Sequence, residues 1–252
     1  MNTALAIAEQ RIRGFSKQRS ATQHERMFFS GMAAALVLAT LVGFAPSYYF
    51  KAHFEAPPPL TPMLHLHGLV MSAWMVLLIA QTSLVAAGRT DIHRRLGVVG
   101  VVLAVAIIIL GPAVAITRAR QGLFCVPCGP PLAALAVPLA TAVVFPVLFV
   151  AAMWLRKRVD AHKRLLLIAT IEFVTAAVGR IPAIHLPGLP SGTMYAATDL
   201  FLVAIAVYDL VALKRLHPAT LAGGSLLVGS QLAREAIKNS PTWLAFAAWV
   251  TT

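Results

Sequence analysis

The feature that most constrains this chain is a series of seven apolar stretches, each near the length of a helix that crosses a bilayer. A helix needs about 20 apolar residues to span the hydrocarbon core of a membrane. Short polar segments separate the stretches, and the seventh is short and rich in glycine. The stretches cover residues 27–46, 62–87, 96–117, 132–155, 165–185, 195–213 and 218–232. The sequence therefore predicts an all-α, polytopic transmembrane helix bundle with seven spans.

Composition excludes the common soluble classes. Hydrophobic residues make up 59% of the 252 residues and charged residues only 12%, whereas soluble domains have roughly 45–50% and about 25%. The surface of one soluble domain could not hide this apolar excess. The formal net charge is +12, which in a soluble protein would suggest nucleic acid. Here the basic residues lie between apolar stretches, so we expect the lipid bilayer as partner and no nucleic acid.

The basic residues also predict an orientation. Fifteen Lys and Arg lie in the N-terminal segment and in alternate connections, and five lie on the other side. Cytoplasmic loops carry this excess. We expect a bacterial inner-membrane protein with its N-terminus in the cytoplasm and its C-terminus in the periplasm. Residues 1–26 then form a basic cytoplasmic segment, and residues 27–232 form the transmembrane domain.

The last segment, residues 233–252, is too short to cross. Trp243 and Trp249 flank apolar residues, and tryptophan favours the membrane–water interface. We predict a short interfacial helix on the outer face. The alternative is a frayed extension of the seventh span.

A six-residue pattern occurs twice, 69 residues apart. Asp91-Ile-His93-Arg-Arg-Leu precedes the third span, and Asp160-Ala-His162-Lys-Arg-Leu precedes the fifth. The acidic residue suits a helix start and the basic pair suits the headgroups. The pattern indicates two duplicated hairpins within a four-helix core, unless the similarity arose by chance.

Ionisable residues inside spans are costly and mark functional sites. An outer layer contains His65, His67, Arg180, His185 and Asp199. We expect Arg180 to pair with Asp199, as a structural ion pair or as part of a substrate site. The His65 and His67 rings lie about 200° apart on a helix. They either join His185 and Asp199 in a metal site, or one faces the bundle and the other the headgroups.

An inner layer contains Gln81, His93, His162, Glu172 and Asp209. Glu172 has apolar neighbours on both sides and needs a partner or a proton. We expect Asp209 at a similar depth, so the two carboxylates could share a proton or a cation. The alternative is an ordinary ion pair between Asp209 and a basic residue of a nearby loop, 156–164 or 214–217.

Other motifs are sparse. Cys125 and Cys128 form a Cys-Val-Pro-Cys pair in an outer loop, where a disulfide is allowed; a small disulfide or two free thiols are both consistent with it. Nucleotide-binding and hydrolase fingerprints are absent from the sequence. The sequence leaves open whether the protein is an enzyme.

Several segments together carry a resemblance. His65-Leu-His67-Gly, Trp74, Gln81 and Asp91-Ile-His93-Arg-Arg-Leu-Gly resemble a family of bacterial multi-pass inner-membrane proteins that implies the fold but no particular activity. More distantly, histidines at both faces of a helical core are similar to those of b-type haem membrane cytochromes. This resemblance implies haem b or a transition metal. The ligands would be His65 or His67 with His185 outside, and His93 with His162 inside.

Three functions follow as hypotheses. The first is a redox role at a histidine-bound haem or metal centre. The second is a proton- or cation-coupled carrier of a small solute that uses Glu172 and Asp209. The third is a non-catalytic membrane subunit or assembly factor, which would bind a membrane protein partner or a second copy of the chain.

Overall fold

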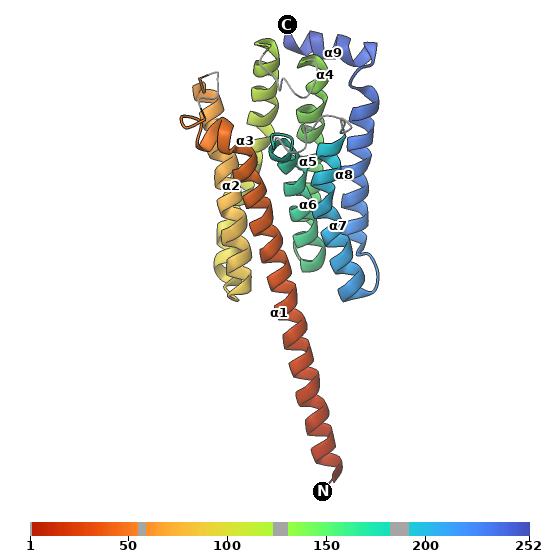
Figure 1. Ribbon diagram of the computed structural model, residues 1–252. Helices are drawn as coiled ribbons and strands as arrows, with labels where there is room; N and C mark the ends of the chain where they lie inside the picture. Colours follow the sequence, from red (N-terminus) through yellow and green to blue (C-terminus); the bar gives the residue numbers. More distant parts are fainter. Residues whose placement is uncertain (1, 55–58, 123–130, 182–191) are drawn as a thin grey trace.

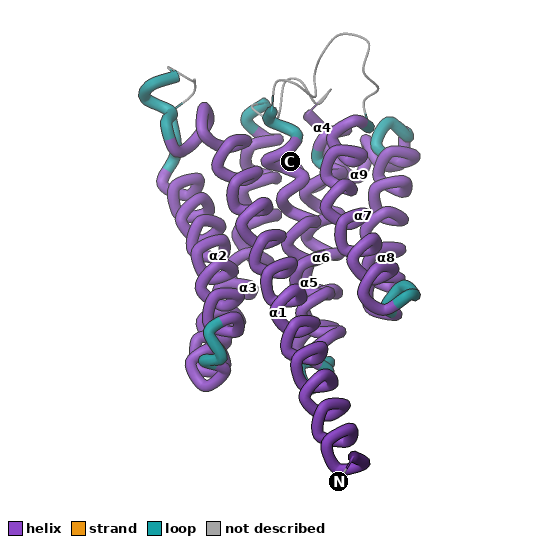
Figure 2. Tube along the Cα trace, turned by 60° about the horizontal axis from the view of Figure 1, so that its bottom comes forward, coloured by secondary structure: helices purple, strands orange, loops and turns teal. Residues whose placement is uncertain are grey.

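The computed structural model describes residues 2–54, 59–122, 131–181 and 192–252, and within these it gives no side-chain placement for residues 2–22 and 131. The described residues form helices and turns without a strand (Figure 2). In the part of the chain that the structure describes, the long helices run side by side along one axis (Figure 1). In chain order these are α1 (Asn2–Phe44), α2 (Pro62–Ala86), α3 (Thr90–Arg120), α5 (Ala136–Trp154), α6 (Val159–Val178), α7 (Thr193–Leu213) and α8 (Pro218–Ile237).

Three shorter helices complete the described fold. A π-helical turn, η1 (Ala45–Tyr49), ends α1, and α4 (Pro131–Ala134) precedes α5. The third, α9 (Pro241–Thr251), lies across the end of the bundle rather than along it (Figure 1). It is a separate helix with its own cap, so the frayed extension of α8 is wrong.

The same signal starts α2, α8 and α9. Each begins with a proline whose missing N–H costs nothing at the first helical position. The preceding residue, Thr61, His217 or Ser240, accepts a hydrogen bond from the first turn through its side chain. Local sequence therefore fixes where these helices begin.

Among the described residues, five helical segments are long and apolar enough to cross a membrane: Gln23–Tyr49, Pro62–Ala86, Thr90–Arg120, Leu132–Trp154 and Thr193–Leu213. Their outward faces carry apolar stripes with helical spacing, which would be wrong for a surface in water. The stripes comprise Val98, Val102, Val105 and Ile109 on α3, Val143, Val147, Val150 and Trp154 on α5, and Leu200, Val203, Val207 and Val211 on α7. The fold is therefore all-α with several helices suited to a bilayer.

Two of the seven long helices, α6 and α8, are not among those five candidate spans. For α6 the reason is its position inside the bundle. Fourteen of the twenty residues of α6 are buried, including Arg164 and Glu172, and α1, α5, α7 and α8 all contact it. The polar residues of α6 contact neighbouring helices and do not face lipid.

Some predicted boundaries are wrong. The third and fifth apolar stretches begin six residues late, because α3 starts at Thr90 and α6 at Val159. The α6 helix ends at Val178 and not at 185, and α8 continues to Ile237 instead of ending at 232. An apolar stretch marks only the part of a helix that can lie in hydrocarbon. The helix itself is defined by its backbone hydrogen bonds, which continue into the polar residues at its ends.

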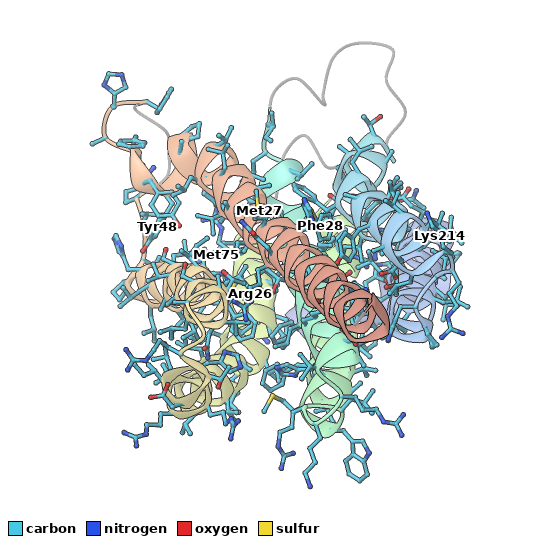
Figure 3. The ribbon with its side chains drawn as sticks, turned by 90° about the horizontal axis from the view of Figure 1, so that it is seen from below. Arg26, Met27, Phe28, Tyr48, Met75 and Lys214 are labelled. Atoms are coloured by element: carbon cyan, nitrogen blue, oxygen red, sulfur yellow. The ribbon has the colours of Figure 1, made fainter. Side chains whose placement is uncertain are left out.

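The ends of the bundle differ in charge. The protruding N-terminal part of α1 and the α2–α3, α5–α6 and α7–α8 connections lie at one end, and α9 lies at the other (Figure 1). We call these the basic end and the α9 end. Seen from the basic end, α1 crosses the bundle between the α2–α3 hairpin and α7 (Figure 3). Phe28 faces α7, where its ring stacks on Tyr208 with centroids 4.2 Å apart.

Candidate functional site

An ion pair between Arg164 and Asp209 ties three helices together near the basic end. Arg164 on α6 donates from Nε and Nη2 to Oδ1 of Asp209 on α7, at 2.9 and 2.5 Å. The other carboxylate oxygen, Oδ2, accepts from Thr220 Oγ1 at 2.6 Å and from the backbone N–H of His217 at 3.1 Å. Both oxygens of Asp209 have partners, so this pair is a closed structural link.

Of the two interpretations of Asp209, the structure agrees with the simpler one, the ordinary ion pair. Its partner belongs to the basic 156–164 segment, as the ordinary ion pair required. The shared proton or cation between Glu172 and Asp209 is wrong, because each carboxylate has its own arginine. Their depths differ as well. Asp209 lies four residues, about 6 Å, from the basic end of α7, whereas Glu172 lies 13 residues, about 20 Å, from the basic end of α6.

The second ion pair joins Glu172 on α6 to Arg234 on α8. Arg234 Nη2 donates to Glu172 Oε1 at 2.9 Å, and Thr141 Oγ1 on α5 donates to the same oxygen at 2.9 Å. Nη2 also donates to Ser230 Oγ at 2.7 Å. The side chains of both ionised residues are at most 2% exposed. All these bonds use one carboxylate oxygen and one terminal nitrogen.

Four polar atoms around this pair are buried without a hydrogen-bond partner among the residues that the structure describes. They are Glu172 Oε2, Thr175 Oγ1, Tyr195 OH and Arg234 Nη1. The guanidinium carbon of Arg234 lies 5.4 Å from the centre of the Tyr195 ring. We call Thr141, Glu172, Thr175, Tyr195 and Arg234 the Glu172 cluster. Each unsatisfied group costs about 1–3 kcal/mol, and such groups in a folded protein indicate a functional role or a bound water or ion.

The predicted pair between Arg180 and Asp199 is wrong. Asp199 on α7 accepts a hydrogen bond from Gln231 Nε2 on α8 at 2.9 Å. Arg180 lies beyond the end of α6, donates to the carbonyl of Ala176 and stacks over the Phe44 ring at 4.5 Å. The two charges separate because α6 ends before Arg180, which turns it toward α1.

The two outer-layer histidines that the structure describes, His65 and His67, do not converge on one metal position. Both His65 and His67 follow Pro62 within α2, so they point to different sides. The His65 side chain is exposed and its ring lies 6.1 Å from Tyr48, whereas His67 is half-buried and its Nδ1 lacks a partner. His185, Cys125 and Cys128 lie outside the described residues. Within the described ranges no three His, Cys, Asp or Glu residues form a metal-ligating group.

The duplicated pattern has the same place in both hairpins. Arg89 and Arg158 precede α3 and α6 with similar backbone angles, φ −86° and ψ 58° against φ −97° and ψ 84°. His93 and His162 then lie in the first turn of each helix, near enough to influence each other electrostatically. His162 Nδ1 contacts the carbonyl of Ala152 at 2.8 Å. The Nδ1 of His93 and the Oε1 of Gln81 are buried without partners.

The partner Arg234 was missed from sequence, and Arg164 was expected only as one of the basic residues of the 156–164 loop. Arg164 appears in a polar loop of the predicted topology, and Arg234 appears beyond the seventh span. The signal that could have found them is the charge of Glu172 and Asp209, since a buried carboxylate needs a cation nearby. Extending α8 by one and a half turns brings Arg234 into the bundle.

Comparisons with protein-family models, with curated proteins and with solved structures found no match to this chain. Function is therefore argued from the geometry alone.

Proposed function

We propose that the chain is a seven-span integral protein of a bacterial inner membrane that acts as a proton-coupled carrier of a small solute. The seven spans are α1, α2, α3, α5, α6, α7 and α8. Apolar stripes on the outward faces and basic connections at one end support this arrangement. Lipid would then surround α3, α5 and α7, while α6 stays enclosed.

The observation that carries the carrier function is the half-satisfied Glu172–Arg234 pair. Arg164 and Asp209 are fully engaged and serve as a fixed link. In contrast, the second pair leaves one donor and one acceptor unused beside two free hydroxyls. A buried carboxylate that can change its charge and its partner is the usual element of a proton relay in a membrane. In this proposal Glu172 carries the proton, and Asp209 has no direct part.

The test is proton-linked uptake in vesicles. Purified protein would be reconstituted into liposomes that enclose a pH-sensitive dye, and lactate, alanine, glucose and phosphate would be added outside in separate experiments. We expect at least one solute to drive acidification above that of protein-free liposomes. Glu172→Gln should abolish it, because glutamine cannot exchange a proton.

The control is Glu235→Gln. Glu235 is the next residue along α8 and pairs with Lys238 at 2.6 Å, so the same chemical change is made outside the cluster. It should retain uptake. Unchanged uptake in Glu172→Gln, or no uptake with any of the four solutes, would contradict the proposal.

A second candidate is a redox role at the basic end. His162 Nδ1 is engaged by a backbone carbonyl, an arrangement that orients the other ring nitrogen toward a metal. His93 lies close by with Nδ1 unused. These two residues could hold a haem or a transition metal, which would supply one-electron chemistry. An absorption spectrum and a metal analysis of the purified protein would test it. We expect a Soret band or one metal per chain, lost in His93→Ala.

A further inference from the structure

We propose that the Glu172 cluster binds a small monocarboxylate together with one proton, and that the proton occupies Glu172 while the carboxylate occupies Arg234. This inference rests on the proposed carrier function and names the class of its substrate. It follows from the geometry of the ion pair, from the charge balance of its surroundings and from the unused hydroxyl groups.

The ion pair with Glu172 uses only one of the two terminal nitrogens of Arg234. A guanidinium presents parallel N–H groups that match both oxygens of a carboxylate. Glu172 takes only one of the terminal nitrogens, through one oxygen, although both residues are buried. Once Glu172 is protonated it no longer competes as an anion. The Nη1 and Nη2 groups of Arg234 can then receive the carboxylate of a ligand.

The charge balance requires proton and anion together. A proton on Glu172 alone would leave Arg234 without the one carboxylate that hydrogen-bonds to it in the described part of the chain. A carboxylate alone would place two anions on one arginine. Either state is strongly unfavourable in an enclosed site, whereas the two together restore neutrality. Binding of the anion is therefore linked to uptake of one proton.

The other charged groups near the cluster are already engaged. Asp199 on α7 accepts from Gln231, and Glu235 on α8 pairs with Lys238. Arg180 donates to its own helix and lies over Phe44 on α1. On α5 the contact is the neutral Thr141. Within the Glu172 cluster itself Arg234 is the one cation and balances one negative charge, so a monocarboxylate fits better than a dianion.

The unused hydroxyls favour a ligand with its own polar group. Thr175 and Tyr195 each carry a buried oxygen without a partner beside the ion pair. A hydroxyl on the ligand would satisfy one of them. Because the cluster residues Glu172, Thr175, Tyr195 and Arg234 are at most 5% exposed, we expect only small acids to fit. Lactate and propionate, which differ by one hydroxyl, are the matched probes.

The first experiment is calorimetric titration of the purified wild-type protein with lactate between pH 5.5 and 7.5. We expect the affinity to rise about tenfold for each unit by which the pH falls, as one bound proton requires. Titrations in two buffers of different ionisation enthalpy should give one proton taken up per lactate. Glu235→Gln should behave as the wild type.

Glu172→Gln mimics the protonated site. It should bind lactate with an affinity that no longer depends on pH and is at least as high as that of the wild type at the lowest pH. Binding without proton uptake by the wild type, persistence of the pH dependence in this variant, or no binding of either acid at any pH would overturn the inference.

A second variant keeps the test decisive if Glu172→Gln does not fold. Tyr195→Phe removes one unused hydroxyl and keeps the ring over Arg234. It should weaken lactate binding at least threefold and leave propionate binding unchanged. Equal loss for both acids, or no loss for lactate, would contradict the role assigned to the hydroxyl and with it the preference for hydroxy acids.

Different experimental results would reject the carrier function and the monocarboxylate site. Proton-linked lactate binding without uptake into vesicles would support the site and reject the carrier. Proton-linked uptake of alanine, glucose or phosphate by a protein that binds neither lactate nor propionate would support the carrier and reject the monocarboxylate.

Discussion

At the scale of single residues, Arg164 forms one buried and one exposed ion pair. Arg164 has a buried partner, Asp209, and an exposed one, Asp160, whose side chain is 67% exposed at 3.7 Å. Asp209→Asn should lower the free energy of unfolding by about 3–5 kcal/mol, because it leaves a buried cation without its anion. Thermal unfolding in detergent would measure the loss.

Asp160→Asn is the matched control, since it removes a carboxylate from the same arginine at the surface. The loss should be about 1 kcal/mol or less. Equal losses in the two variants would show that burial does not set the strength of these pairs.

His217 supplies a pH dependence at the start of α8. Its Nδ1 accepts the N–H of Ala219 at 3.0 Å, which only the neutral ring can do. Burial, and then the charge of Arg164, lower the pKa of His217 from its ordinary value of 6.5. The folded state therefore resists protonation more than the unfolded state. The stabilisation is complete above pH 6.5 and is lost as the pH falls through the lowered pKa.

The measurement is the unfolding temperature between pH 7.5 and 5.5. We expect a decrease with falling pH in the wild type. His217→Asn keeps a good capping group that does not titrate in this range, so its decrease should be smaller. If the unfolding temperature of His217→Asn fell with pH as much as that of the wild type, the pH dependence would arise from other groups.

At the scale of elements, α1 approaches the backbone of α6 closely at Gly43. A Cβ at this position would overlap the backbone of Ala177. Gly43→Ala should therefore cost about 1–3 kcal/mol of unfolding free energy through overpacking, although alanine is the better helix former. Gly31 on the same helix has open space around it, so Gly31→Ala should be neutral or stabilising by up to about 1 kcal/mol.

Chemical unfolding of both glycine variants would check this. Equal stability of Gly43→Ala and Gly31→Ala would mean that α1 can move away from α6 without loss.

The sequence predicted elements better than it predicted the partners of charged residues. Apolar length located all seven long helices, because each exposes or buries mainly hydrocarbon. It misplaced the ends of α6 and α8, where charged residues are satisfied by other helices. Glu172 could be identified as a buried carboxylate, but its partner lies 62 residues further along the chain. Only the packing of α6 against α8 brings the two together.

At the scale of the whole molecule, the asymmetry of charge predicts orientation. The basic end should face the cytoplasm and the α9 end the periplasm. Trp243 on α9 donates to the Leu132 carbonyl at 2.9 Å, and Arg120 donates to Val250 at 3.2 Å, so α9 is fixed to that end. An alkaline phosphatase fused after Thr252 should be active. Fused after Lys214 in the α7–α8 connection, it should be inactive, and activity at both positions would contradict seven spans.

The central position of α6 has a consequence for biosynthesis. As a nascent segment it carries Asp160, Lys163, Arg164 and Glu172, and the counterions Asp209 and Arg234 have not yet emerged from the ribosome when it does. Transfer of such a charged segment into lipid on its own would be unfavourable. We therefore expect α6 to stay beside α5, or within the insertion machinery, until α7 and α8 arrive, so that the last helices made decide whether an earlier one enters the membrane.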